Sequence, residues 1–193
     1  MPHAPALPDL ALIEPEIAGN VGAILRSAAC FGAGVHIVEP CGFAFSDARL
    51  KRAGMDYLAH AMIARHADRH SFLDQMAAAG RRLVLMTTAG AEDFYGHRFA
   101  ANDVILFGNE GHGAPSDIHA AAHVRLAIPM QPGTRSLNVS VAAGIALAEA
   151  RRQLLWIADA IGALGALERH RCEGGVDFTA YLTEMSPVWS RRP

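Results

Sequence analysis

The chain has 193 residues, of which 51% are hydrophobic and 19% charged, and its formal net charge is −2. This length suits one domain with a short appendage, and the composition excludes a disordered acidic tail, a collagen-like fibre and a histone-like polycation. The nearly balanced charge also argues against a protein that holds nucleic acid through bulk electrostatic attraction.

Short apolar runs of strand length alternate with segments of helix length along the chain. Strands are predicted at residues 10–13, 35–38, 82–87, 104–108 and 124–128, because each run is rich in Val, Ile or Leu. Residues 61–65 are a candidate for a further short strand.

Helices are predicted in the intervening segments. Residues 21–31 carry apolar side chains at helical spacing and stop at Gly32, and residues 71–79 open with Ser71 as the expected cap and stop at Gly80. Strands that alternate with helices in this order are typical of α/β folds with a mainly parallel sheet. We therefore expect an α/β domain whose sheet is flanked by helices.

The longest predicted helix covers residues 136–161, and it is expected to pack against the sheet or a partner subunit. After Gly162 the composition changes to small residues, charges and aromatic side chains. We accordingly divide the chain into one domain, residues 1–161, and an appendage, residues 162–193, that is not an independent domain.

The cysteines and the apolar runs indicate a cytoplasmic protein. Cys30, Cys41 and Cys172 form no CxxC pair, which argues against a disulfide framework and a zinc knuckle. The longest mostly apolar run, residues 139–147, is far shorter than the roughly 20 residues that a membrane span needs. The N-terminus shows no signal pattern, so neither secretion nor membrane insertion is expected.

Three glycine-containing loops follow predicted strands, where doubly wound sheets bind their ligands. The first, residues 14–22, leads into a helix that carries Asn20 and Arg26. These two side chains could form a polar platform that faces a substrate. They fit equally well as a helix cap and a solvated cation.

The second loop, residues 107–113, contains Gly108, Gly111 and Gly113. This density of glycine suggests a backbone wrapped closely around a ligand, although the spacing matches neither the dinucleotide nor the phosphate-loop motif. A loop without a phosphate-binding lysine suits a neutral or cationic nucleoside, and a plain turn is the alternative. His112 is either a site residue or a solvent-facing turn residue.

The third loop, residues 128–140, is stiffened by two prolines and Gly133. Ser136 is expected to cap the following helix, whose unpaired N–H groups can bind a polar ligand. Capping explains Ser136, but it does not explain both Asn138 and Ser140.

Other polar clusters carry less weight. The histidines of residues 66–70 are spaced like metal ligands, but a polar loop is the favoured interpretation, and no metal is predicted. A small basic and aromatic patch is a candidate for RNA binding. Its members are Arg49, Lys51, Arg52 and Tyr57, with Arg65, Arg69, Arg81 and Arg82 as candidates for the same surface. Ordinary solvated charge explains these side chains equally well.

The three loops, in this order, resemble the three motifs of the SpoU branch of the SPOUT (trefoil-knot) RNA methyltransferases. Residues 20–26 (NVGAILR) are similar to the first motif, residues 106–113 (LFGNEGHG) to the second, and residues 128–140 to the third. More narrowly, residues 12–17, 36–43 and 50–57 resemble the TrmL group, which are small tRNA wobble-nucleotide 2′-O-methyltransferases.

The resemblance implies a SPOUT fold, in which the C-terminal part of a parallel sheet is threaded through a loop as a deep trefoil knot. Such a knot is an exception to the rule that protein chains avoid knots. It also implies a homodimer in which both chains build each active site, and S-adenosyl-L-methionine as the cofactor, which leaves as S-adenosyl-L-homocysteine. The positions that match the cofactor site are Met86, Thr87, Gly108, Asn109, Glu110, Gly113, Ile128, Met130, Ser136 and Leu137.

The implied reaction is 2′-O-ribose methylation of the wobble cytidine or uridine of tRNA, without a metal. The positions that match the catalytic residues are Arg26, Asn20, Glu110, Ser136 and Asn138. In the family the first-motif arginine is the proposed base, but deprotonating a guanidinium at neutral pH would require about 9 kcal/mol. We expect Arg26 instead to hold the adjacent phosphate while the proton leaves to phosphate or water.

Three alternatives stay open at this point. One is a SpoU-type enzyme that methylates another tRNA position or rRNA, and the second is a non-catalytic RNA-binding module. The third, suggested by the nearly balanced charge, is a nucleotide-binding protein unrelated to RNA. The presence of Arg26, Glu110 and Asn138 argues against the second. His112, where the family often has arginine, and Arg151, in a segment that differs from the family pattern, leave the RNA contacts and the dimer packing undefined.

Overall fold

The structure, a computed structural model, describes residues 7–44, 62–89 and 92–154. These residues belong to one compact unit, Met1–Leu155. The predicted patch of Arg49, Lys51, Arg52 and Tyr57, the end of the helix predicted at 136–161 and the appendage lie outside the described residues.

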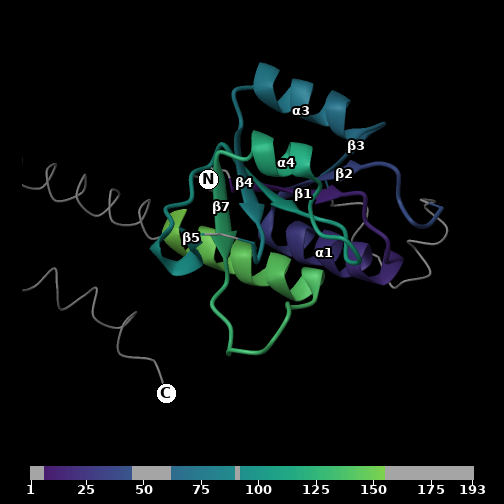
Figure 1. Cartoon of the computed structure of the whole chain (residues 1–193). Helices are drawn as coiled ribbons and strands as arrows, with labels where there is room; N and C mark the ends of the chain where they lie inside the picture. Colours follow the sequence, from purple (N-terminus) through teal and green to yellow (C-terminus); the bar gives the residue numbers. More distant parts are fainter. Residues whose placement is uncertain (1–6, 45–61, 90–91, 155–193) are drawn as a thin grey trace, which may run out of the picture. The chain divides into compact units, whose positions relative to one another are not determined.

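A seven-stranded sheet forms the centre of this unit, with the strand order β3-β2-β1-β6-β4-β7-β5 (Figure 1). Every strand pairing in it is parallel, which confirms the predicted α/β class. The strands are β1 (Asp9–Ile13), β2 (Gly34–Val38), β3 (Met62–His66), β4 (Arg82–Met86), β5 (Glu92–Asp93), β6 (Asp103–Phe107) and β7 (Val124–Ala127). All except β5 agree with the predicted runs to within one residue at each end.

Helices cover both faces of the sheet. The described helices are α1 (Ala18–Phe31), α3 (Arg69–Ala78), α4 (Ser116–Ala121), the short 3-10 helix η2 (Phe94–Gly96) and a last helix of which residues 139–154 are described. The α1 helix and the last helix pack on one face, and α3 and α4 pack on the other (Figure 1). Within the described residues, no helix is long and apolar enough to cross a membrane.

The strand sequences account for this two-sided packing. Leu10 and Leu12 of β1 join the core under α1, whereas Ala11 and Ile13 join the core under α3. Successive side chains of a strand point to opposite faces, so a strand that is covered on both sides is apolar at every position. The continuous apolar runs of the sequence are therefore buried strands.

Three helices begin at residues other than those predicted, and the first of them, α1, starts at Ala18 instead of Val21. Asp68, rather than Ser71, caps α3, because its side chain accepts the N–H of Ser71 at 2.7 Å in a capping box. The last helix begins at residue 139 instead of 136, and Asn138 is its cap, with Oδ1 2.8 Å from the N–H of Ser140. The prediction that Ser136 caps this helix is wrong, since Ser136 lies three residues before the first helical residue.

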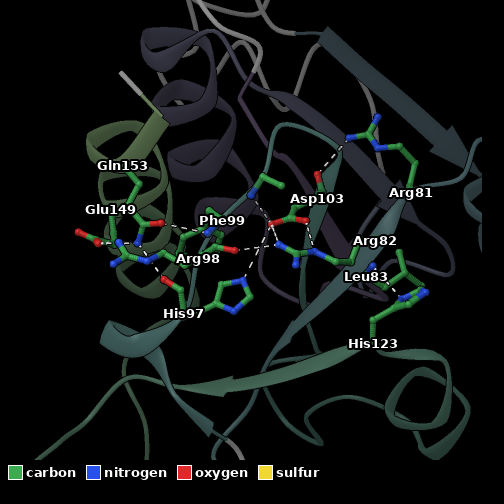
Figure 2. A network of polar contacts seen from close by, with 11 residues as sticks. Arg81, Arg82, Leu83, His97, Arg98, Phe99, Asp103, His123, Glu149 and Gln153 are labelled. Carbon is green, nitrogen blue, oxygen red and sulfur yellow. Dashed lines mark hydrogen bonds and ion pairs between the residues drawn. The ribbon is translucent and has the colours of Figure 1, made fainter. Parts of the chain in front are cut away.

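A polar network at the amino edge of the sheet attaches the last helix to the strands (Figure 2). Asp103 is fully buried and accepts two hydrogen bonds from the Arg82 guanidinium, at 2.5 and 2.7 Å. Gln153 of the last helix accepts the N–H of Phe99 and donates to the carbonyl of His97, both at 3.0 Å. The buried carboxylate is thus paired, and the helix is held to the segment beside it.

The strand order brings several loops together at the opposite, carboxyl edge. The chain winds from β1 through β2 to β3 on one side, and β6 lies on the other side of β1. Such a reversal opens a crevice at the carboxyl ends of the two central strands, where ligands of open α/β sheets bind. The β4 and β7 strands lie next in the order, so the loops after β1, β6, β4 and β7 converge there.

Candidate active site

A pocket of about 550 Å³ lies at this carboxyl edge. Its walls are formed by the ends of β4, β6 and β7, the first turn of α1, and the segment that leads into the last helix. The volume and the mixture of apolar and polar walls are those of a site for a small organic ligand or cofactor.

The loop after β6 is closed on itself by hydrogen bonds. Asn109 and Gly113 exchange two backbone hydrogen bonds, at 3.0 and 2.8 Å, and Oδ1 of Asn109 accepts the N–H groups of Gly111 and His112. A side chain on Gly108 would place its Cβ 2.2 Å from the nitrogen of Ala114. The glycines therefore serve a tight backbone turn against the pocket.

Glu110 projects from this loop to the N-terminus of α1. One carboxylate oxygen accepts the N–H of Glu16 at 2.8 Å, and the other accepts the N–H of Ile17 at 3.3 Å and the side-chain amide of Asn20 at 3.0 Å. The side chain at the helix's own cap position, Ile17, makes no capping bond. A carboxylate from a distant loop thus supplies the cap and opposes the positive end of the helix dipole.

These hydrogen bonds also set the charge of Glu110. Burial raises the pKa of Glu110, but the N–H of Glu16 and the amide of Asn20 outweigh that effect, so its pKa lies below the usual value. Glu110 is a carboxylate at neutral pH, with both oxygens already occupied by donors of the first loop.

Asn20 connects all three loops. Its amide nitrogen donates to Glu110, and its Oδ1 accepts the amide of Asn138 at 3.0 Å. Asn138 in turn holds Ser140 through its own Oδ1. Asn20 is therefore not the helix cap, because it lies in the first turn of α1. It does lie at the pocket, as a platform residue would, but its side chain bridges the two other loops.

The pocket brings together most of the residues that the sequence singled out. All ten predicted cofactor positions line it, namely Met86, Thr87, Gly108, Asn109, Glu110, Gly113, Ile128, Met130, Ser136 and Leu137. Of the predicted catalytic residues, Asn20, Glu110, Ser136 and Asn138 line it as well. Arg26 does not, and lies on the exposed side of α1.

Several lining residues had no predicted role. They are Ile17, Thr88, Phe107, Ala114, Leu126, Arg135, Val139 and Ala142, and His112, whose place was left open, lines the pocket too. Most of them adjoin a residue that was predicted, because they share its loop or strand end. Arg135, directly before Ser136, is the one that a closer look at the third loop could have found.

The arginines proposed as one RNA-facing surface are instead distributed over several ion pairs. They are Arg65 with Glu39, Arg69 with Glu14 and Asp117, Arg81 with Asp9, and Arg82 with Asp103. Asp9 begins β1 and Glu14 follows its end, so Arg69 and Arg81 lie at opposite edges of the sheet. These two residues therefore do not adjoin each other, and a role of either in RNA binding stays a prediction.

The histidines of residues 66–70 do not gather around a common point. His66 is buried at the end of β3 with Nε2 2.9 Å from Nδ1 of His36, while Asp68 caps α3. In the part of the chain that the structure describes, no group of three or more His, Cys, Asp or Glu side chains could hold a metal ion.

The sequence also matches a known family over most of the pocket-forming unit. Residues 9–148 match the model of the SpoU rRNA Methylase family. The chain belongs to the SpoU rRNA Methylase family. This SpoU methylase is 49% identical over 144 residues to a tRNA (cytidine(34)-2′-O)-methyltransferase of Ancylobacter novellus, an alignment that covers 75% of the chain and 91% of the relative.

Solved structures of the family share the fold. A structure that gives insights into the 2-OH methylation of C/U34 on tRNA is 39% identical, with a TM-score of 0.73, covering 78% of this SpoU methylase and 98% of that chain. An AdoMet-bound rRNA methyltransferase from Sinorhizobium meliloti is 34% identical with a TM-score of 0.70, covering 78% of the chain and 58% of that protein.

Proposed function

We propose that this chain transfers a methyl group from S-adenosyl-L-methionine to the ribose 2′-hydroxyl of the wobble cytidine or uridine of tRNA. The observation that carries the proposal is the Glu110–Asn20–Asn138 chain, which joins the three motifs at the rim of one pocket. The names of the relatives, which describe methylation at position 34 of tRNA, support the choice of substrate.

The pocket fits the cofactor in size and in chemistry. Its apolar walls, which include Met86, Leu126, Ile128 and Met130, suit a nucleobase, and the glycine loop at 108–113 offers backbone groups to a sugar. When bound, S-adenosyl-L-methionine supplies a methyl group on a sulfonium sulfur, an electrophile that needs no metal. The solved AdoMet-bound relative supports this assignment.

The protein's own contribution to the reaction is mainly orientation. Holding a hydroxyl in line with a methyl group accelerates transfer by avoiding the entropic cost of alignment. Ser136 and Asn138 present a hydroxyl and an amide at the pocket, and both are assigned to the cofactor or the ribose. Glu110 holds the first loop in place through Glu16, Ile17 and Asn20.

Arg26 is assigned to the RNA. It is exposed on α1, the helix whose first turn carries Asn20 into the pocket. A guanidinium there can hold a phosphate next to the target ribose by two parallel hydrogen bonds, and the hydroxyl proton then leaves to phosphate or water. This assignment avoids the high energy of a neutral arginine.

We extend the proposal to a homodimer. Three large apolar side chains near the pocket are exposed, Ile17 by 51%, Leu137 by 39% and Val141 by 51%. Exposed apolar patches are typical of interfaces, and a partner chain would cover side chains of this kind. Light scattering is expected to give twice the mass of one chain, and the mass of a single chain would contradict the dimer.

The decisive experiment supplies the protein with labelled S-adenosyl-L-methionine and total tRNA that lacks the wobble methyl group, and maps the labelled nucleotide. Label at position 34 is expected, and Arg26→Ala should abolish it while Arg26→Lys reduces it. Label at another tRNA position, or label in rRNA but not in tRNA when rRNA is supplied in a parallel reaction, would overturn the target. Cofactor binding without any transfer would favour a non-catalytic module.

A further inference from the structure

Glu14 joins the end of β1 to the first loop in an unusual backbone conformation. Its φ is 50°, and among the described residues it is the one residue other than glycine with a positive φ. A side chain makes this conformation unfavourable, so the surrounding contacts must maintain it. Such positions occur often at functional sites.

The contacts of Glu14 reach two of the site's loops. Its carbonyl accepts the side-chain amide of Asn109 at 2.8 Å, and Asn109 closes the loop at 108–113. Directly after Glu14 and Pro15 come Glu16 and Ile17, whose N–H groups bind Glu110. The orientation of Glu14 therefore affects the loops after both β1 and β6.

Arg69 holds the side chain of Glu14 from outside the pocket. Its Nη1 lies 2.7 Å from Oε1 of Glu14, and its Nε lies 2.8 Å from Oδ2 of Asp117 in α4. The guanidinium thus bridges the first residue of the first loop and the helix that follows the second loop. Arg69 is itself fixed as the first residue of α3, next to the capping box of Asp68 and Ser71.

We propose that Arg69 is a positioning residue for the methyl-transfer site. It keeps Glu14 in its positive-φ conformation and ties that residue to α4, so the two loops keep their relative orientation around the pocket. The proposal rests on the proposed function for its cofactor-binding readout only. A planar guanidinium suits this task because it directs two donors to two carboxylates, which a lysine cannot do in the same geometry.

The chain offers a matched control at the other end of the same strand. Arg81 donates to Asp9 at 2.6 Å, and both pairs are partly buried, with side-chain exposures of 23% and 22% against 33% and 25% for Arg69 and Glu14. Arg81 lies at the amino edge of the sheet, away from the pocket. A purely structural ion pair should behave like Arg81, and a positioning residue should not.

The test compares Arg69→Ala, Arg69→Lys and Arg81→Ala in the full chain by calorimetric titration with S-adenosyl-L-methionine, by urea unfolding and by hydrogen exchange. Arg69→Ala is expected to weaken cofactor binding about three- to fivefold, the upper part of the range for exposed ion pairs, and Arg69→Lys less. Exchange of the Gly111 and His112 amides should rise in Arg69→Ala. Arg81→Ala should lower stability and leave affinity and these amides unchanged.

Two outcomes would overturn the proposal. One is unchanged affinity and unchanged exchange at 108–113 in Arg69→Ala, and the other is an equal change in Arg81→Ala. A double-mutant cycle with Glu14→Gln adds a check, because the two effects should not be additive if they share one contact. Failure of wild-type transfer to tRNA would reject the proposed function instead, and the exchange comparison would still decide the role of Arg69.

Discussion

Gly108 illustrates how one residue type can be required by backbone proximity alone. A Cβ there would lie 2.2 Å from the nitrogen of Ala114 and 2.4 Å from the carbonyl carbon of Gly113. No rotamer change can relieve a clash with backbone atoms. The glycine is needed for the tight turn of the loop, whatever ligand the loop contacts.

We therefore predict that Gly108→Ala destabilises the protein by about 2 to 4 kcal/mol and abolishes cofactor binding, because the loop must open. Gly19→Ala is the matched control, since a Cβ at Gly19 meets nothing within 4 Å and the residue lies in α1. It should be neutral or slightly stabilising. Urea unfolding and calorimetry measure both, and normal binding by Gly108→Ala would contradict the prediction.

At the scale of elements, the third loop separates the roles of two neighbouring polar residues. Both line the pocket, but Asn138 also caps the last helix and reaches Asn20 of α1, whereas Ser136 lies in the segment before that helix. The same stretch of sequence thus contains one residue that shapes the fold as well as the site and one whose role is confined to the site.

Asn138→Ala should cost about 1 kcal/mol of stability from the lost cap, and it should also lower transfer because Asn20 loses its partner. Ser136→Ala should lower transfer or cofactor affinity without a change in the urea midpoint. Thermal or urea unfolding of both variants beside wild type distinguishes the two roles. Equal loss of stability in Ser136→Ala and Asn138→Ala would contradict the assignment of the capping role to Asn138.

The elements also show which features the sequence could predict. The strands were predictable because burial on both faces leaves an apolar run with few interpretations, as in β6, where all five residues are buried. The start of α1 was predicted late, at Val21 instead of Ala18, because its cap is Glu110, 90 residues away from Asn20. The six-residue α4 and the two-residue β5 are too short to produce a periodic pattern.

The candidate site likewise contains residues that the sequence could predict and residues that it could not. Loop residues with a motif, such as Asn109 and Ser136, were predictable because a resemblance fixes their positions. The ion pairs of Arg69 were not, because Glu14, Asp117 and Arg69 are far apart in sequence and meet only in the folded chain. The positive charge of Arg69, without knowledge of its partners, suggested a surface for RNA instead.

At the scale of the whole unit, buried histidines make stability depend on pH. Burial, and then the nearby charge of His36, lowers the pKa of His66, and burial, and then Arg82, lowers that of His97, where Asp103 and Glu92 act in the opposite direction. Both rings resist protonation in the folded state, whereas the unfolded chain takes up protons near the ordinary value of 6.5. The unfolded state then binds more protons, so stability falls as pH decreases below about 7.

We predict a progressive loss of unfolding free energy between about pH 7.5 and 5.5, followed by a second loss below about pH 4.5 as Glu110 and other paired carboxylates protonate. His66→Gln and His97→Gln should each reduce the first slope. His70→Gln should leave it unchanged, because the side chain of His70 is 89% exposed. Urea unfolding at four pH values tests this, and a pH-independent stability above pH 5.5 would contradict it.

The bond between Asn20 and Asn138 joins residues 118 positions apart in the chain. During synthesis the first loop emerges early, but its partner follows only after every described strand has been made. A nascent chain that stops after β7 would contain the described sheet but not the third loop, which forms one side of the pocket. Closing a contact across so many residues carries a cost in loop entropy that must be met before the contact contributes. The pocket is therefore complete only once residues as far as Ala142 have been made and folded, so ligand binding requires the start of the last helix.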